Sequence, residues 1–216
     1  MTVGKQRDAR YRVRALRSPV ARTRRLELIL PDPRRAAEIV RLLSDPSTAR
    51  WTLTMPFPYR PRDAQAFFRR ARAARRSGAS LAVHVVRRSD GALVGGMGLH
   101  DIDPTHLRAE VGYWVGREFR RQGFAQEALG ALCRLAYHRL GLRRLEAGVF
   151  PGNVASIRVL RRAGFRREGR MRQSVRKAGV GQDVILYARL RDDPVARRAA
   201  AGSGPSRRGP SAAPTR

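Results

Sequence analysis

The chain has 216 residues, and its 46 lysines and arginines against 17 acidic residues give it a formal charge of +29. Its 42% hydrophobic content excludes a fully disordered chain, and no apolar run approaches the roughly 20 residues that a membrane-spanning helix needs. The single cysteine, Cys133, excludes an intramolecular disulfide framework and a cysteine-based zinc finger.

The positive charge invites a nucleic-acid interpretation. All but two of the basic residues are arginine, however, since Lys5 and Lys177 are the only lysines. Arginine used almost everywhere, together with many alanines and glycines, is typical of a bias toward GC-rich codons. The charge therefore does not by itself establish a nucleic-acid partner.

The composition divides the chain into three regions. Residues 1–22 are basic with one acid, Asp8, and we expect them to form a flexible, solvent-exposed arm. Residues 194–216 consist mainly of Ala, Gly, Ser, Pro and Arg, and cannot bury enough apolar surface to offset the entropy of ordering. The sequence thus predicts one domain over residues 23–193, followed by a disordered tail.

The first half of this domain reads as a strand, two helices and a three-stranded meander. Alternating apolar residues predict the strands, and proline at a first helical position predicts the helix starts. The Asp90-Gly91 pair predicts a hairpin turn between two of the strands. The expected elements are a strand over 24–30, helices beginning at Pro33 and Pro61, the second ending near Gly78, and strands over 81–87, 92–101 and 108–115.

The second half alternates helices with strands. The expected elements are a long helix over 122–140, a strand over 144–150, a helix over 153–163 closed by Gly164, and strands over 165–172 and 183–190, joined by a loop around Gly179 and Gly181. This order predicts an α/β (α+β) fold with a mixed sheet of about seven strands and about four flanking helices.

The stretch from Glu110 to Ala125 is the most informative one. A strand ends, a basic loop follows, and a long helix begins, where unpaired backbone N–H groups and the helix dipole favour an anion. Gly123 removes a side chain where a phosphate would approach, and Arg120 and Arg121 can make charge-assisted contacts. We interpret the loop as a pyrophosphate cradle, with a simple tight turn as the alternative.

Two motifs carry a resemblance to a known family. Arg120-x-x-Gly123-x-Ala125 resembles the [QR]-x-x-G-x-[GA] signature of the GCN5-related N-acetyltransferases (GNAT). Residues 153–165 resemble that family's N-x-x-[AS]-x-x-x-[YL]-x-x-x-G-F motif, and residues 168–188 resemble the subgroup that acetylates the N-termini of ribosomal proteins. The resemblance implies the GNAT fold, with a mostly antiparallel sheet, and a cytoplasmic enzyme that uses acetyl-CoA and no metal.

The resemblance also implies which residues bind the cofactor. In the family, loop amides bind the pyrophosphate, a strand amide polarises the thioester carbonyl, and an asparagine contacts the pantetheine arm. These roles fall here on Val115 for the carbonyl, Asn153 for the pantetheine, and the loop residues Arg120, Arg121, Gln122, Gly123, Phe124 and Ala125. Asn153 is also a good helix N-cap, and both roles are compatible.

Two residues are candidates for proton transfer. In the family an acid at the position of Glu110 can accept the amine proton, often through water; the alternatives are a sheet-edge charge or a salt bridge to a neighbouring arginine. Leu160 stands where many members place a tyrosine that protonates the leaving thiolate, and leucine cannot do this. Ser156, one turn earlier, can donate a hydroxyl proton, and the resemblance to the ribosomal subgroup implies it as the acid, with a helix-start hydrogen bond as its alternative role.

The resemblance to the ribosomal subgroup implies the N-terminal α-amine of a protein as the acceptor. The chemistry agrees, since an α-amine has a pKa of about 7.7–8.0 against about 10.4 for lysine and needs less help to lose its proton. A small-molecule amine is the alternative acceptor, although so basic a surface would repel a polycationic one. The alternative from another class is an inactive GNAT-fold protein that binds RNA or the ribosome. Any RNA or ribosome contact is expected through the basic arms, and no membrane contact is expected.

Other residues receive structural interpretations. The four histidines show no metal-ligand spacing, and His84 is expected to face outward from its strand. Cys133 is expected to be a buried structural thiol. Aromatic residues between Trp51 and Phe68 fall in the region that shapes the family's acceptor pocket, with core packing as the favoured role.

Overall fold

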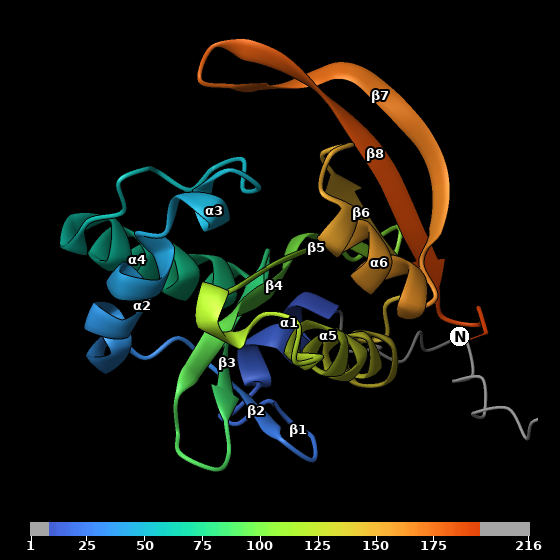
Figure 1. Cartoon of the computed structure of the whole chain (residues 1–216). Helices are drawn as coiled ribbons and strands as arrows, with labels where there is room; N and C mark the ends of the chain where they lie inside the picture. Colours follow the sequence, from blue (N-terminus) through green and yellow to red (C-terminus); the bar gives the residue numbers. More distant parts are fainter. Residues whose placement is uncertain (1–8, 195–216) are drawn as a thin grey trace, which may run out of the picture.

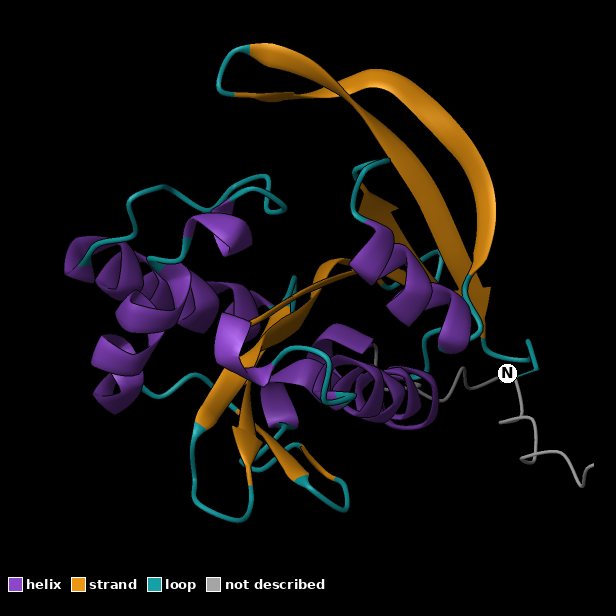
Figure 2. Ribbon diagram, viewed as in Figure 1, coloured by secondary structure: helices purple, strands orange, loops and turns teal. Residues whose placement is uncertain are grey.

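A computed structural model describes residues 9–194 and builds them on one open sheet with the strand order β1-β2-β3-β4-β5-β6-β8-β7 (Figures 1 and 2). The strands are β1 (Ala21–Arg22), β2 (Leu26–Ile29), β3 (Leu81–Arg87), β4 (Leu93–Asp103), β5 (Arg108–Val115), β6 (Arg144–Val149), β7 (Arg166–Lys177) and β8 (Val180–Leu190). Every neighbouring pair is antiparallel except β5 and β6, which run parallel. The predicted mostly antiparallel sheet is confirmed, with eight strands where about seven were expected.

The helices lie in two groups beside this sheet. They are α1 (Ala9–Ala15), α2 (Ala36–Leu43), α3 (Pro46–Ala49), α4 (Pro61–Ser77), α5 (Phe124–Arg134) and α6 (Val154–Arg162). Single 3-10 turns precede α2 and α5 at Pro33–Arg35 and Arg117–Phe119, and α5 continues as a π-helix over Leu135–Leu140. Helices α2, α3 and α4 lie together on one side of the molecule, and α5 and α6 lie on the other (Figure 1).

The prediction of an exposed arm over residues 1–22 is wrong from Ala9 onward. Helix α1 buries Val13 fully, and Leu16 is only 4% exposed. Strand β1 then pairs with β2. The apolar face of α1 consists of only a few residues that lie between arginines, so the composition of the segment does not reveal it. Residues 1–8, and the predicted tail from residue 195, lie outside the described residues.

Helix starts follow the proline signals, with one addition. Asp32 accepts a hydrogen bond from the Arg34 N–H and caps the 3-10 turn that leads into α2. Helix α4 begins at Pro61, as predicted, and ends at Gly78, whose φ of +77° suits glycine. Helix α3 was not predicted, although Asp45 caps it and Pro46 begins it.

The β7–β8 hairpin is longer than the sequence predicted. The expected loop around Gly179 and Gly181 is a tight turn at Ala178 and Gly179, both with positive φ, between strands paired as far as Lys177 and Val180. Exposed arginines on both strands hide the alternation that marks a strand. The hairpin rises from the sheet and arches over toward α3 (Figure 1). Among the described helices, none is long and apolar enough to cross a membrane.

Candidate active site

The sheet opens between its two parallel strands. Strands β5 and β6 pair at three positions, the last joining Glu110 to Glu146, and then diverge. Beyond Glu110, β5 stays paired to β4, with Gly98 opposite Gly112 and Gly95 opposite Val115. One edge of β5 therefore faces an opening in the middle of the sheet.

Backbone groups of β5 point into this opening. The Gly116 N–H donates to the Val94 carbonyl at 2.9 Å, on the β4 side. Because peptide groups alternate along a strand, the N–H groups of Val115 and Tyr113 point to the other side, toward the opening. The Val115 amide thus faces the opening, and its role as a donor to a thioester carbonyl stays a prediction.

The basic loop lies between the end of β5 and the start of α5. Arg121 and Gly123 have positive φ values of 61° and 78°, so the backbone turns sharply before α5 begins. Arg121, Gln122 and Gly123 are exposed, while Ala125 is half-buried. Backbone N–H groups in such turns at a helix start form concave anion sites. The positive φ values and the helix start agree with the predicted diphosphate cradle, which stays a prediction.

The side chain of Arg120 is engaged within the protein. Its Nε donates to the Val115 carbonyl at 3.1 Å, and its two terminal nitrogens donate to the hydroxyls of Ser47 and Thr48, each at 2.7 Å. Arg120 therefore ties the end of β5 to α3. This geometry favours a positioning role for its side chain and leaves the phosphate contacts mainly to the loop backbone and Arg121.

A second brace holds the start of α5, and sequence analysis missed it. Arg25 pairs with Glu127 at 2.7 Å, donates to the Gln122 carbonyl at 3.0 Å, and lies 4.6 Å from the centroid of the Phe124 ring. Phe124 is buried, so its side chain anchors the helix while its backbone remains at the loop. Nothing in the local sequence pairs Arg25 with residues about a hundred positions away.

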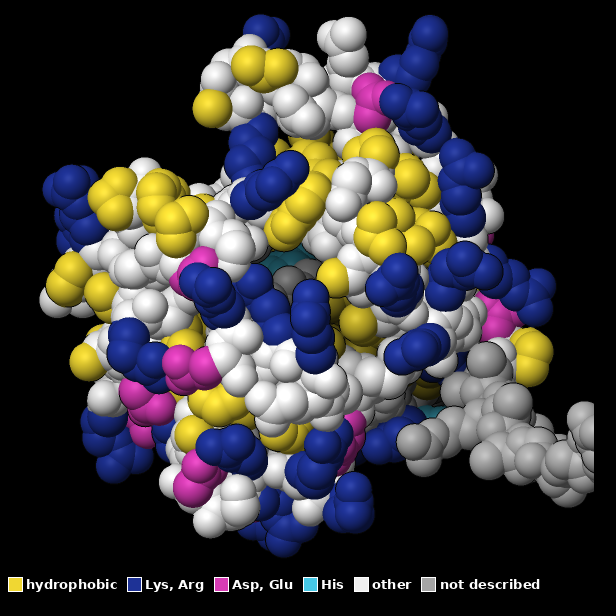
Figure 3. All heavy atoms as spheres, viewed as in Figure 1, with side chains coloured by type: hydrophobic (Ala, Val, Ile, Leu, Met, Phe, Trp, Pro, Cys, Tyr) yellow, Lys and Arg dark blue, Asp and Glu magenta, His cyan; other side chains and the backbone are white. Residues whose placement is uncertain are grey.

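A cleft of about 890 Å³ lies on the face of the sheet that carries Glu110. Its walls come from α2, the segment after α3, α4, strands β3 to β6, α6 and the overhanging hairpin. Figure 3 shows the surface hollowed at the centre of the view, between hydrophobic and basic side chains, with histidine atoms inside the hollow. Glu110, Asn153 and Ser156 line the cleft, whereas Val115 and residues 120–125 lie beyond it.

Glu110 is exposed to this cleft but surrounded by enough protein to lose part of its hydration. Desolvation, with the negative charges of Asp101 and Glu146, raises the pKa of Glu110 above its ordinary value, and a hydrogen bond from the Gly148 backbone offsets part of this. A raised pKa makes the carboxylate a stronger base. Glu110 has no ion pair with an arginine among the described residues, so the alternative salt-bridge role is not what the geometry shows.

The charge of the cleft differs from that of the whole chain. Asp101, Glu110 and Glu146 line it, with Arg108 as the one arginine or lysine among its described lining residues. The predicted repulsion of cationic amines therefore applies to the outer surface and not to the cleft itself, where a protonated amine is attracted.

Ser156 lies opposite, at the start of α6. Its N–H donates to the Asn153 side chain at 3.1 Å, so Asn153 is the N-cap of the helix. The Ser156 hydroxyl lies 2.8 Å from the Tyr113 hydroxyl, and desolvation raises the pKa of Tyr113 to about 12. Leu160 is fully buried. A phenol is therefore present beside Ser156, supplied by β5 and not by α6.

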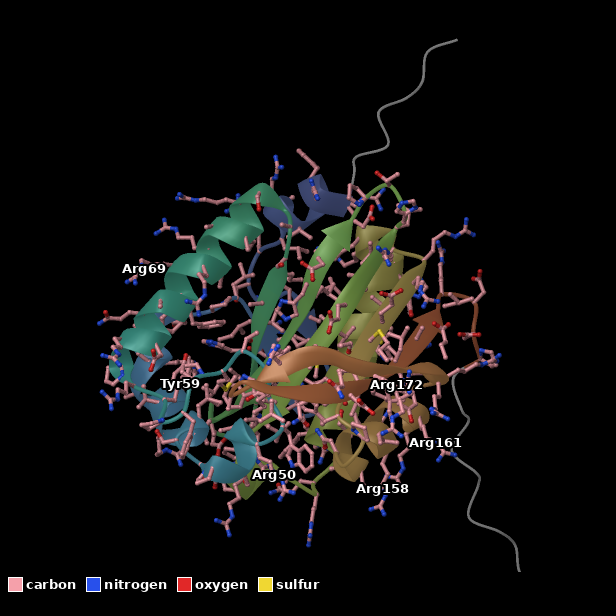
Figure 4. All side chains as sticks on the ribbon, turned by 90° about the horizontal axis from the view of Figure 1, so that it is seen from above. Arg50, Tyr59, Arg69, Arg158, Arg161 and Arg172 are labelled. Atoms are coloured by element: carbon pink, nitrogen blue, oxygen red, sulfur yellow. The ribbon has the colours of Figure 1, made fainter. Side chains whose placement is uncertain are left out.

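Lys177 links the hairpin that overhangs the cleft to the end of α3. Its Nζ donates to the carbonyls of Ala49, Arg50 and Thr52, each at 2.7 Å, at the end of α3. In Figure 4 the hairpin crosses over the sheet, with Arg50 and Tyr59 on the side of its tip, Arg172 partway along it, and Arg158 and Arg161 on the side of its base. One of only two lysines in the chain thus joins segments about 130 residues apart.

The structure corrects the expectation for His84 and confirms the one for Cys133. His84 does not face outward to solvent: it is 1% exposed and packs against Phe67 and Phe68. It faces α4 because that helix covers this part of β3. Cys133 is buried, as predicted. Within the described part of the chain, no group of three or more histidine, cysteine or acidic side chains could hold a metal ion.

Comparison with known proteins identifies the same architecture. The profile of the acetyltransferase (GNAT) domain matches residues 25–166. The chain is 38% identical over 104 residues to the uncharacterized N-acetyltransferase YoaA of Bacillus subtilis, covering 48% of this chain and 59% of that one. It is 34% identical over 100 residues to the ribosomal-protein-serine acetyltransferase of Escherichia coli, covering 46% and 56%. The chain thus spans less than two thirds of the length of these curated relatives.

A solved structure extends the similarity over more of the chain. Mycobacterium smegmatis RimJ, in complex with a CoA-disulfide, superposes with a TM-score of 0.70 at 25% identity, covering 77% of this chain and 82% of that one. The opened sheet and the loop before α5 lie within the matched residues 25–166.

Proposed function

This chain belongs to the GNAT acetyltransferase family, and we propose that it transfers an acetyl group from acetyl-CoA to the free α-amine of a protein N-terminus. The observation that carries the proposal is the opening of the sheet after Glu110, with free β5 amides on one side and an acid-lined cleft on the other. The names of relatives that act on ribosomal proteins support a ribosomal protein as the acceptor.

The residues fit acetyl-CoA as the donor substrate. The turned loop at residues 121–123 and the start of α5 offer backbone N–H groups to the diphosphate. The inward N–H groups of Val115 and Tyr113 can accompany the pantetheine arm along β5 toward the cleft. Hydrogen-bond donors fixed in this way stabilise the negative charge that develops on a thioester oxygen during attack.

Glu110 and Ser156 provide the proton transfers. Glu110 accepts a proton from the ammonium, directly or through water, and the neutral amine attacks the thioester carbon. The C–N bond forms, the nitrogen releases its remaining excess proton to water, the C–S bond breaks, and the thiolate takes a proton from the Ser156 hydroxyl. Tyr113, hydrogen-bonded to Ser156, can replace that proton and so relay it from the phenol.

Thiol release from acetyl-CoA, with mass analysis of the product, tests the proposal. The acceptors are peptides with a free N-terminus, the same peptides with a blocked N-terminus and an internal lysine, and small polyamines. We expect acetylation of the free-terminus peptides only. Turnover of polyamines alone would contradict the acceptor class, and strong RNA binding without CoA binding would contradict the enzyme assignment.

A further inference from the structure

We propose that the cleft contains a second recognition point, formed by His84 and Trp114, that binds an uncharged hydroxyl or carboxamide which the acceptor carries on an apolar stem. The inference rests on the proposed function, because the acceptor is the ligand. It adds a preference for the acceptor's second or third side chain.

His84 has hydrogen-bonding capacity that the protein does not use. Its side chain is 1% exposed, and neither ring nitrogen has a hydrogen-bond partner among the described residues. Most buried polar groups in native proteins have a hydrogen-bond partner, so two ring nitrogens without one need an explanation. His84 also lines the cleft, which places the explanation in a ligand.

The surroundings of His84 extend this point across the sheet. His84 lies opposite Gly96 on β4, and Gly96 lies opposite Trp114 on β5. A Cβ on Gly96 would come within 2.6 Å of the Trp114 Nε1 atom, so the indole lies over this glycine. The imidazole and the indole N–H therefore flank the same bare stretch of backbone and can engage one ligand group together.

The approach to His84 is apolar. Phe67 stacks on the imidazole with a centroid distance of 6.1 Å, and Phe68 meets it edge-on at 6.0 Å. Ile39 and Leu43 line the same cleft. A charged side chain would lose its hydration here without an ionic partner, whereas an apolar stem fits.

The ring is in its neutral form at physiological pH. Desolvation, with the nearby positive charge of Arg35, lowers the pKa of His84 to about 4. A neutral imidazole offers one donor and one acceptor. A hydroxyl or a carboxamide can match both, and an indole N–H can serve the ligand's oxygen as well. These two groups are therefore favoured over methyl, ammonium and carboxylate ends.

The distance from Glu110 sets which acceptor residue reaches His84. Trp114 is four residues along β5 from Glu110, and β3 lies two strands away, which gives roughly 16 Å between the Cα positions of Glu110 and His84. Gly98 and Gly112 add no side chains to the intervening surface, where the His100 imidazole lies over both glycines and forms the floor that the acceptor would cross. An extended peptide advances about 3.5 Å per residue, so its second or third side chain spans the rest.

The test compares acceptor peptides that differ only in hydrogen bonding. Each has a free N-terminal alanine and carries tyrosine or phenylalanine, or glutamine or methionine, at position two or three. At one of these positions we expect kcat/KM to be about 10-fold higher for tyrosine than for phenylalanine, and for glutamine than for methionine. His84→Phe, which keeps an aromatic ring between Phe67 and Phe68, should abolish both preferences while retaining turnover of the phenylalanine peptide.

The outcomes separate this inference from the proposed function. Acetylation of all peptides at equal rates would overturn the subsite and leave the function standing, as would a preference that survives in His84→Phe. If no peptide is acetylated, the proposed function fails, and calorimetry decides the subsite with Ala-Ala-Tyr amide and Ala-Ala-Phe amide as probes. Tighter binding of the tyrosine probe to wild type alone supports it; equal affinities overturn it.

Discussion

The two sides of the opened sheet are built in different ways. The proposed cofactor side is a single stretch, from the end of β5 through the loop to the start of α5, and the ligand groups proposed for it are mostly backbone N–H groups. The acceptor side collects the segment after α3, helix α4, the sheet floor and the β7–β8 hairpin. A backbone-built site depends on loop conformation, whereas an assembled site depends on side chains that meet only in the folded chain.

Support for the two sides also differs. Arg25 with Glu127, Arg41 with Glu118, and Arg120 with α3 brace the loop from several directions. The hairpin tip is held to the far wall of the cleft by the three hydrogen bonds of Lys177. We therefore expect the cofactor side to be rigid and the acceptor side to adapt to its ligand.

We expect the largest loss of kcat from a substitution of Glu110, which acts in the chemical step and not in binding either substrate. Because the pKa of Glu110 is raised and the base acts when ionised, the rate should fall as the pH falls through that pKa. Glu110→Gln should lower kcat roughly 100-fold and leave only the pH dependence of the amine. A pH–rate profile of both proteins checks this. An unchanged profile in the variant would remove Glu110 from the mechanism.

A smaller effect is expected where the two sides meet, at Tyr113 and Ser156. Ser156→Ala should lower kcat about 10-fold, and Tyr113→Phe somewhat less, since the phenol acts through the serine hydroxyl. Because the residues act as a unit, the double variant should be no slower than Ser156→Ala. Additive losses in single-turnover measurements would instead assign them independent roles.

The smallest effect concerns Lys177. Lys177→Ala removes the contact between the hairpin and α3, and should raise the acceptor KM about 5-fold without changing affinity for acetyl-CoA. Lys177→Arg should restore only part of this, because a planar guanidinium does not converge on three carbonyls as an ammonium does. Arg176→Ala, on the neighbouring exposed residue, is the matched control. Steady-state kinetics with each substrate varied in turn checks this. A loss of affinity for acetyl-CoA as large as that for the acceptor would contradict the division into a cofactor side and an acceptor side.

Sequence reasoning predicted the strand, the turn and the helix of the proposed cofactor side because their signals are local. Strand β5, the turn at Gly123 and the start of α5 follow one another within about twenty residues, and each has its own pattern. The Asn153 cap is local in the same way. The prediction of an exposed arm before Ala21 was wrong because only a few apolar residues of α1 are buried, and they alternate with arginines.

The acceptor side could not be predicted because its contacts are not local. Lys177 meets Ala49 across 128 positions, and Tyr113 meets Ser156 across 43. His84 looks like any residue of an alternating strand until α4 is placed over it. Pairings of this kind follow from the strand order, which the sequence pattern alone does not specify.

Binding of acetyl-CoA to two glycine variants tests the central claim, that the turned loop before α5 is the cofactor cradle. Gly123 and Gly91 have nearly the same positive φ, and a Cβ at Gly91 meets nothing within 4 Å, so Gly91→Val controls for backbone strain. By calorimetric titration, Gly123→Val should bind acetyl-CoA roughly 100-fold more weakly than wild type, and Gly91→Val within about 2-fold of it. Wild-type affinity in Gly123→Val would contradict the account.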